Sequence, residues 1–255
     1  MSKLWLVGTS LLFVSLAHAQ ETEPSKADDI EVPSPWESEV EFGYQSHSGN
    51  TDNESLNARL NGEYVQGRHR FTGEWKFYLL YKNGKENKRQ STYTLQSDYK
   101  LSAKTYFYTS FKGIDSRYSA YFKDYTLSGG LGYQVTNTEK FLLEVEAGPG
   151  FRYQEPNLDE IDDDDIVFPE TVQEGIFRGN LAATWKPLKV LTFTSNVTVV
   201  TGKSNTRTDI DLSTINNITE DIALKLTYSR TSHDRVPEGL YKADSIFAAN
   251  LLFVF

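Results

Sequence analysis

The chain has 255 residues, of which 38% are hydrophobic and 13% aromatic, and its formal net charge is -9 at pH 7. This acidity argues against nucleic acid as a partner, because a polyanion binds clusters of Lys and Arg. The chain contains no cysteine, which excludes disulfides, a thiolate nucleophile and a Cys-ligated metal site. Stability therefore has to come from backbone pairing and packing.

The first residues, MSKLWLVGTSLLFVSLAHAQ, have the three parts of a secretory signal peptide. Lys3 supplies a short basic region, residues 4–16 an apolar core, and Ala17-His18-Ala19 a small-residue cleavage site. We therefore predict a signal peptide over residues 1–19, because an uncleaved anchor helix would need a longer apolar core. Loss of Lys3 changes the net charge from -9 to -10.

The next segment, QETEPSKADDIEVPSP at residues 20–35, is polar, acidic and contains three prolines. Pro24, Pro33 and Pro35 disfavour a helix, and the composition is typical of disorder. We predict a disordered periplasmic lead-in here, followed by one domain over residues 36–255.

From residue 36 onward the hydrophobic pattern has a period of two, as in a strand with one apolar face. In WESEVEFGYQ, for example, Val40, Phe42 and Tyr44 share one face and glutamates occupy the other. The pattern predicts an antiparallel up-and-down β-barrel of twelve strands, with ten or fourteen as alternatives because the fifth, sixth and tenth segments are the least regular. The segments are residues 36–45, 56–64, 70–81, 93–101, 107–113, 125–133, 141–147, 177–185, 191–199, 210–214, 222–228 and 247–255.

The apolar face of these segments carries no Asp, Glu, Lys or Arg. A water-soluble barrel with this face inside would explain the alternation equally well. Three features favour lipid: aromatic residues such as Trp36 and Trp185 stand at segment ends, short connections alternate with mostly longer ones, and an even strand number puts both termini on one side. We therefore predict an all-β transmembrane barrel in the outer membrane, with both barrel termini in the periplasm.

The last segment, FAANLLFVF, aligns Leu251, Phe253 and Phe255 on one face. An unpaired apolar strand would be prone to aggregation, so we expect it to pair with the first strand and leave no edge. An aromatic last residue after apolar alternate positions also resembles the insertion signal of outer-membrane barrels. That resemblance implies the barrel-assembly machinery as a partner.

The stretch VEFGYQSHSGNTDNESLNARLNGEY resembles the opening hairpin of the YdiY-like, salt-induced outer-membrane protein family. The resemblance implies a barrel of the Gram-negative cell envelope, without established substrate or catalytic residues, and it extends over the mature chain. The motif is a strand that ends in glycine, a polar tetrapeptide and a second alternating strand; its residues are Gly43, Ser48, Gly49, Asn50 and Thr51.

The polar face of the segments is expected to line the lumen, and it holds more acids than bases. A water-filled lumen would then favour cations, whereas pairing of the bases with the acids would make a salt-bridged plug. We expect a narrow or occluded pore. The charged residues assigned to this face are Glu37, Glu39, Glu41, Arg59, Glu63, Arg70, Glu74, Lys76, Asp98, Lys100, Glu144, Glu146, Arg178, Asp209, Asp211, Asp221 and Lys225.

Two short stretches raise the alternative of a membrane hydrolase, Ser-His-Ser at residues 46–48 and Ser-His-Asp at residues 232–234. Outer-membrane phospholipases, which also have twelve strands, resemble one another in having His and Ser two residues apart, so that both project from one strand face. Here the residue two after His47 is Gly49. We therefore expect polar loops and no catalytic residue.

The most acidic stretch is LDEIDDDDIVFPE, residues 158–170. Its carboxylates are candidate ligands for Ca²⁺ or Mg²⁺, and such ions would bridge to lipopolysaccharide phosphates. The spacing lacks the glycine of a defined calcium loop, so we expect a solvated loop and no metal. The candidate ligands are Asp162, Asp163, Asp164 and Asp165.

Together these features predict a non-enzymatic outer-membrane protein without a cofactor, in contact with outer-membrane lipid and lipopolysaccharide. We expect either a narrow, porin-like, cation-preferring channel for an unknown small solute or a structural barrel related to salt or acid stress. The alternatives are a phospholipase-like hydrolase and a surface receptor or adhesin that uses the long loops.

Overall fold

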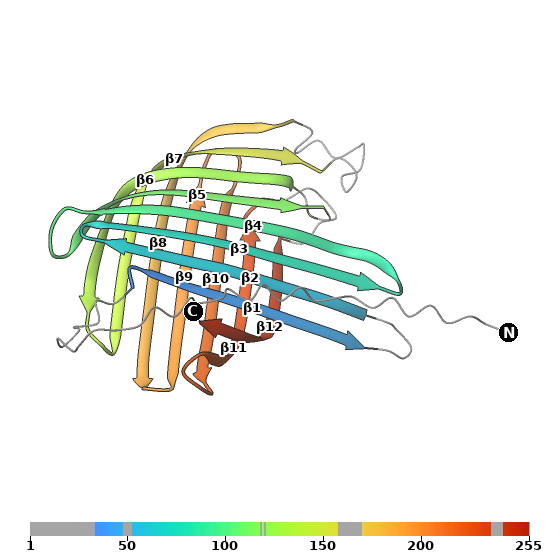
Figure 1. Cartoon of the computed structure of the whole chain (residues 1–255). Coiled ribbons are helices and arrows are strands. Elements are labelled where there is room, and N and C mark those ends of the chain that lie inside the picture. The colour runs from blue at the N-terminus through green and yellow to red at the C-terminus, as the bar shows by residue number, and fades with distance from the viewer. Residues whose placement is uncertain are drawn as a thin grey trace, which may run out of the picture. The chain divides into compact units, whose positions relative to one another are not determined.

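The structure is a computed structural model that describes residues 34–47, 53–117, 119, 121–157, 170–235 and 242–254. In these ranges twelve strands form one closed barrel, in which each strand is antiparallel to its neighbours and β1 pairs with β12 (Figure 1). The predicted fold and strand number are therefore confirmed. The predicted signal peptide and almost all of the lead-in lie outside the described residues.

Most strands extend beyond the predicted segments. β7, predicted to end at Ala147, continues through Gly148-Pro149-Gly150 to Pro156, although such a triplet is typical of a strand break. The strands are β1 (Trp36–His47), β2 (Asn53–Gln66), β3 (His69–Lys82), β4 (Lys85–Lys100), β5 (Thr105–Ser116), β6 (Tyr121–Asn137), β7 (Phe141–Pro156), β8 (Val172–Leu188), β9 (Leu191–Thr201), β10 (Thr206–Asn217), β11 (Ile222–His233) and β12 (Ala243–Val254).

The connection between β3 and β4 is only two residues long, whereas the connections on this side were expected to be mostly longer. Asn83 and Gly84 both have positive φ, 52° and 72°. Such a pair forms the tight hairpin turn whose twist matches that of the flanking strands. The long connection expected here is therefore wrong, because β4 begins at Lys85 and takes up most of it.

The barrel has two ends, which differ in their connections. We call the end where β1 begins and β12 ends the terminal end; it also holds the connections β2–β3, β4–β5, β6–β7, β8–β9 and β10–β11. The opposite end, the loop end, holds the remaining connections. Figure 1 shows β1 to β5 lying across the view, with β8 to β11 standing nearly vertical in the opposite wall. Ion pairs between these two walls therefore cross the lumen.

The two faces of the wall are chemically opposite. Along β1, Phe42 is 55% exposed while the neighbouring Glu41 is 2% exposed. The same holds around the barrel, where the fully buried large side chains include Arg152 and Arg207. An apolar outside with a polar inside is the reverse of a water-soluble barrel and matches a barrel in lipid.

Aromatic side chains pack against each other on the outside of the terminal end. The ring centroids of Trp36 and Tyr64 are 4.6 Å apart, and those of Trp185 and Phe193 are 5.4 Å apart. Such rings are typical of the headgroup boundary of a membrane barrel. Among the described residues, no helix has the length and hydropathy needed to span a bilayer.

Candidate functional site: the charged lumen

The acids on β1 lie in a cluster of charges beside the closure between β1 and β12. Arg59 of β2 contacts Glu39 at 2.7 Å and Glu41 at 2.5 Å, and it also bonds to Glu74 of β3. From the other side, Lys225 of β11 reaches across β12 to Glu41 at 2.5 Å. We call this group, with Asn250, the seam cluster. Arg59 and Lys225 neutralise most of the charge of the glutamates that were predicted on the inner face of the first strand.

A second group, the terminal-end cluster, joins strands that are not neighbours near the terminal end. Arg70 of β3 contacts Asp98 of β4 at 2.7 Å and reaches Glu144 of β7 at 3.5 Å. Beside it, Gln96 of β4 donates a 2.8 Å hydrogen bond to Glu146 of β7. The link from β3 and β4 to β7 therefore spans the lumen.

Glu146 is held by two further side chains of the same cluster. Arg178 of β8 contacts it at 2.7 Å, and the hydroxyl of Tyr106 donates to it at 2.9 Å. Tyr106 lies over β6 at Gly132, where any side chain would collide with its ring. The missing side chain at Gly132 thus lets an aromatic ring lie flat inside the barrel.

A third group, the loop-end cluster, joins β10 to the opposite wall. Arg207 contacts Asp124 of β6 at 2.6 Å, and Asp209 contacts Lys112 of β5 at 2.9 Å. Nearby, the buried Arg152 of β7 bonds to Glu174 of β8 and to Asn205. Separating a buried ion pair leaves a charge with neither a partner nor water, so these contacts resist opening and the group acts as a brace.

One weaker link joins β3 to β10 between these levels. Lys76 lies 3.1 Å from Glu74 and 3.6 Å from Asp211. The side chains of Lys76 and Asp211 are 36% and 34% exposed, so water screens this link. The lumen is therefore more open here than in the loop-end cluster.

Four of the residues assigned to the lumen lie near the terminal end and form no ion pair with these clusters, although Glu63 is near Arg70. Glu37 and Lys100 are exposed, and Glu63 is half-buried. Asp221 is in the connection between β10 and β11 and is exposed, because β11 begins only at Ile222. Its assignment to a strand face inside the barrel is therefore wrong.

The period-two pattern in the sequence did not identify the charged residues of the loop-end cluster as lumen-facing. The predicted segments were too short: the one over 141–147 ended before Arg152, and those over 177–185 and 210–214 began after Glu174 and Arg207. The signal was present, because these residues continue the parity of Glu146, Arg178 and Asp209 on their own strands. The members missed in this way, or left unassigned, are Lys112, Asp124, Arg152, Glu174 and Arg207.

The family motif and the C-terminal signal are only partly within the described residues. Gly43 is buried on β1, whereas Ser48, Gly49, Asn50 and Thr51 lie outside the described residues, as do the acidic candidates Asp162, Asp163, Asp164 and Asp165. Leu251 and Phe253 pair with Phe42 and Val40 of β1, and Phe255 is not described. In the described ranges no group of acids or histidines is arranged to hold a metal ion.

The Ser-His-Asp stretch does not assemble as a catalytic unit. His233 points toward Asp124, with Nε2 4.0 Å from the carboxylate, while Asp234 accepts a 2.7 Å hydrogen bond from the backbone of Thr206. Ser232 donates to the carbonyl of Thr208 at 3.4 Å. Each side chain of the stretch thus has a separate structural contact.

Comparison with known proteins places the chain in a family. The family described as "Protein of unknown function, DUF481" matches residues 40–255. The uncharacterized protein YdiY of Escherichia coli (strain K12) is 27% identical over 234 residues, which cover 89% of this chain and 87% of YdiY.

Two solved structures are similar at 11% identity and a TM-score of 0.49. One is a NanC porin, with coverage of 85% of this chain and 98% of the porin. The other is an outer membrane channel from Pseudomonas putida F1, with coverage of 91% and 100%. The resemblance to the YdiY-like family is confirmed by the family match, which extends over the barrel from its first strand. The chain belongs to the DUF481 family of proteins of unknown function.

Proposed function

We propose that this protein is a non-enzymatic barrel of the outer membrane whose lumen is closed to through-passage by ion pairs. The observation that carries the proposal is that charged side chains join strands across the lumen at two levels, with the weaker and more exposed Lys76–Asp211 link between them. Lys112 meets Asp209 near the loop end, and Arg70 meets Glu144 near the terminal end. Barrels of twelve strands are intermediate in width, so side chains can fill them.

The outer surface supports the membrane part of the proposal. Leu95, Leu131 and Phe177 are each more than half exposed on different strands. A continuous apolar surface of this kind would drive association in water, whereas acyl chains cover it at no cost. The terminal end would face the periplasm, and lipid, lipopolysaccharide and the barrel-assembly machinery would be the partners.

The contacts favour the structural barrel over the cation-preferring channel. Cation selectivity needs carboxylates that are free to meet a passing ion. Glu41 and Glu146 are instead bound by Arg and Lys side chains at 2.7 Å or less. The acid excess of the lumen is therefore largely neutralised along any through-path. A role in salt or acid stress remains a prediction from the family resemblance alone.

Planar-bilayer recordings of the refolded protein test this proposal. We expect no conductance steps from the wild type, because ions meet a brace at two levels. Removing both braces, with Lys112→Gln and Asp209→Asn at the loop end and Arg70→Gln and Glu144→Gln at the terminal end, should produce steps. Opening either level alone should not.

A matched control removes an ion pair from the outside. Lys123 of β6 and Glu155 of β7 form a 3.0 Å pair, and both side chains are 35% exposed. The variant Lys123→Gln with Glu155→Gln should stay silent. Cation-selective steps from the wild type under a salt gradient would refute the proposal.

A further inference from the structure

The wall of the barrel is incomplete between β1 and β12. These strands pair only from Glu39↔Val254 to Phe42↔Leu251. Beyond Phe42, β1 stays paired with β2 up to His47, and β12 stays paired with β11 back to Ala243. Figure 1 shows β12 running beside β1 only near its end and then turning away with β11. Among the described residues, two strand edges therefore diverge toward the loop end.

The split begins at the edge of the apolar band. Trp36 and Tyr44 are both exposed on the outer face of β1, eight residues apart, which is about 26 Å of strand. At the strand tilt of about 40° of a membrane barrel, this length rises about 20 Å, against an apolar band about 25 Å tall. The split, which starts at Gly43, is then close to the outer boundary of the band, and it runs toward the depth at which water and lipid head groups can satisfy unpaired backbone groups.

Two buried amide oxygens without a donor face the lumen where the split begins. The oxygens of Asn57 and Asn250 both lie within 2.6 Å of the point that a Cβ on Gly43 would occupy. Neither oxygen accepts a hydrogen bond from the described residues. Asn250 is fixed in this orientation because its amide nitrogen donates to Glu41 at 3.2 Å. A pair of acceptors without a partner favours a ligand that brings N–H or O–H donors, and because both oxygens are buried, such a ligand reaches them when β12 moves away from β1.

The inward face beside the split carries fewer charges than the rest of the lumen. By the strand registers, Ile246 and Ala248 of β12 point inward there, and the flanking inward residues of β2 and β11 include the uncharged Ser55 and Ser229. On the outer face, Tyr44 and Phe247 are apolar. An apolar chain can therefore lie on both sides of the opening, while the lumen offers polar groups to a head group.

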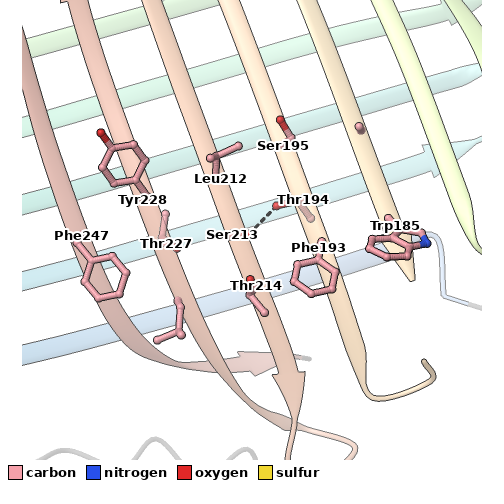
Figure 2. Close-up of a pocket in the computed structure, with 12 residues that line it drawn as sticks. Trp185, Phe193, Thr194, Ser195, Leu212, Ser213, Thr214, Thr227, Tyr228 and Phe247 are labelled. Atoms are coloured by element: carbon pink, nitrogen blue, oxygen red, sulfur yellow. Dashed lines mark hydrogen bonds between the residues drawn. The ribbon is translucent and has the colours of Figure 1, made fainter. Parts of the chain in front are cut away.

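An apolar groove on the outside of the barrel leads to the same place. It has a volume of about 490 Å³ and crosses β8 to β12 (Figure 2). One register row of its lining runs from Ala183 through Leu212 and Tyr228 to Phe247. Phe247 is 71% exposed and belongs to the part of β12 that pairs with β11 but not with β1. In Figure 2, Phe247 and Tyr228 stand at one end of the groove and Trp185 at the other.

We propose that the split between β1 and β12 is a lateral opening that takes an amphiphile, with an apolar chain and a hydroxyl-bearing head, from the outer leaflet into the mouth of the lumen. The chain lies along the groove and between the apolar rims, and the hydroxyls donate to Asn57 and Asn250. A phosphate or carboxylate head lacks these donors and is excluded by the same pair of oxygens. The opening does not depend on the braces that close the through-path.

Cysteine pairs test the opening directly, because the natural chain has no cysteine. Phe42→Cys with Leu251→Cys lies in the paired part of the closure and should oxidise readily. Ser46→Cys with Phe247→Cys, which the same register would place opposite each other, should not oxidise in lipid vesicles. Equal oxidation rates for the two pairs would show a closed wall and overturn the proposal.

A photoreactive dodecyl maltoside, with its diazirine in the chain, tests the ligand. Mass spectrometry of the labelled protein should find the probe on β1 and β12. Asn57→Leu with Asn250→Leu should reduce this labelling about tenfold, as expected for loss of hydrogen bonds to a buried site. The control, Asn180→Leu with Asn196→Leu, removes a hydrogen-bonded amide pair from β8 and β9 and should leave it unchanged.

Two further arms separate a bound ligand from the surrounding lipid. Bridging Ser46→Cys and Phe247→Cys with a short bis-thiol reagent should abolish the labelling, whereas the Phe42–Leu251 disulfide should preserve it. Photoreactive dodecyl phosphate should label the outer strands evenly, with no excess at β1 and β12. Equal labelling by both probes, or labelling that survives the bridge, would refute the ligand. The absence of conductance steps from the wild type is compatible with the presence or the absence of labelling. Failure of the labelling experiment would therefore refute the lateral opening for an amphiphile and leave the proposed closed barrel unaffected.

Discussion

Two regions of the barrel wall differ in how they are held together. β7 and β8 pair without interruption from Phe141↔Trp185 to Gln154↔Val172, while β1 and β12 share only four residue pairs. Behind β7 the lumen is filled by buried ion pairs along most of the strand. Behind the closure the buried charges of the seam cluster end at Glu41, and where the pairing of β1 with β12 stops the lumen holds Gly43, Asn57 and Asn250. We therefore expect the wall at β7 and β8 to be a fixed scaffold and the unpaired edges of β1 and β12 to be more mobile.

The difference in hydration has an energetic consequence. Arg152 and Arg207 are 0% exposed in the loop-end cluster, whereas Lys76 of β3 and Asp211 of β10, in the link between the clusters, are about one-third exposed. Removing one partner of a buried pair leaves a buried charge without a partner, while an exposed pair contributes little. Substitutions should therefore be costly in the buried ion pairs and mild in the exposed ones.

The largest effect is expected from Arg207→Leu. This change leaves the carboxylate of Asp124 buried next to an apolar side chain, so we expect a loss of about 3–5 kcal/mol in the free energy of unfolding. Urea unfolding of the barrel in lipid vesicles measures it. The double variant Asp124→Leu with Arg207→Leu should regain most of the loss, because apolar pairs often replace buried ion pairs without cost. A loss below about 1 kcal/mol for Arg207→Leu would show that the two regions do not differ in this way.

The fold could be predicted from the sequence because the information is local. Alternation with a period of two is set by each strand on its own, so it gave the number of strands and most inward positions. The full length of β7 was missed because Gly148-Pro149-Gly150 is typical of a break, although the strand passes through it.

The candidate site was predicted less completely because its contacts are distant in the sequence. Arg207 and Asp124 are on strands that are not neighbours, and nothing near either residue indicates its partner. The split at the closure is equally hidden, since β1 and β12 alternate as regularly as the other strands. Gly43 was identified only through its family motif, and the structure adds the room that it leaves for Asn57 and Asn250.

A smaller effect is expected from Gly43→Ala. Its methyl group would displace the amides of Asn57 and Asn250, and with them the hydrogen bond to Glu41, at a cost of about 1 kcal/mol in the same unfolding experiment. Gly62→Ala on β2 is a matched control, because a Cβ there has no atom within 4 Å. We expect no loss for Gly62→Ala, and equal losses for both variants would remove the special role of Gly43.

The smallest effect on stability is expected from Asp244→Asn, which weakens a 3.3 Å contact with Lys88 of β4. Among the described residues, this is the one ion pair that links the part of β12 not paired with β1 to a distant strand of the barrel. The Asp244 side chain is 59% exposed, so the free energy of unfolding should change by less than about 1 kcal/mol. The mobility of β12 should change much more, because a contact that contributes little to global stability can still limit a local opening. In a Phe247→Cys background, Asp244→Asn should increase the rate of reaction with a water-soluble maleimide several-fold, whereas Lys123→Gln should not. An unchanged rate would mean that β12 is fixed by its pairing with β11 alone, and the contrast between a rigid scaffold and a mobile closure would then be smaller than the wall pairing indicates.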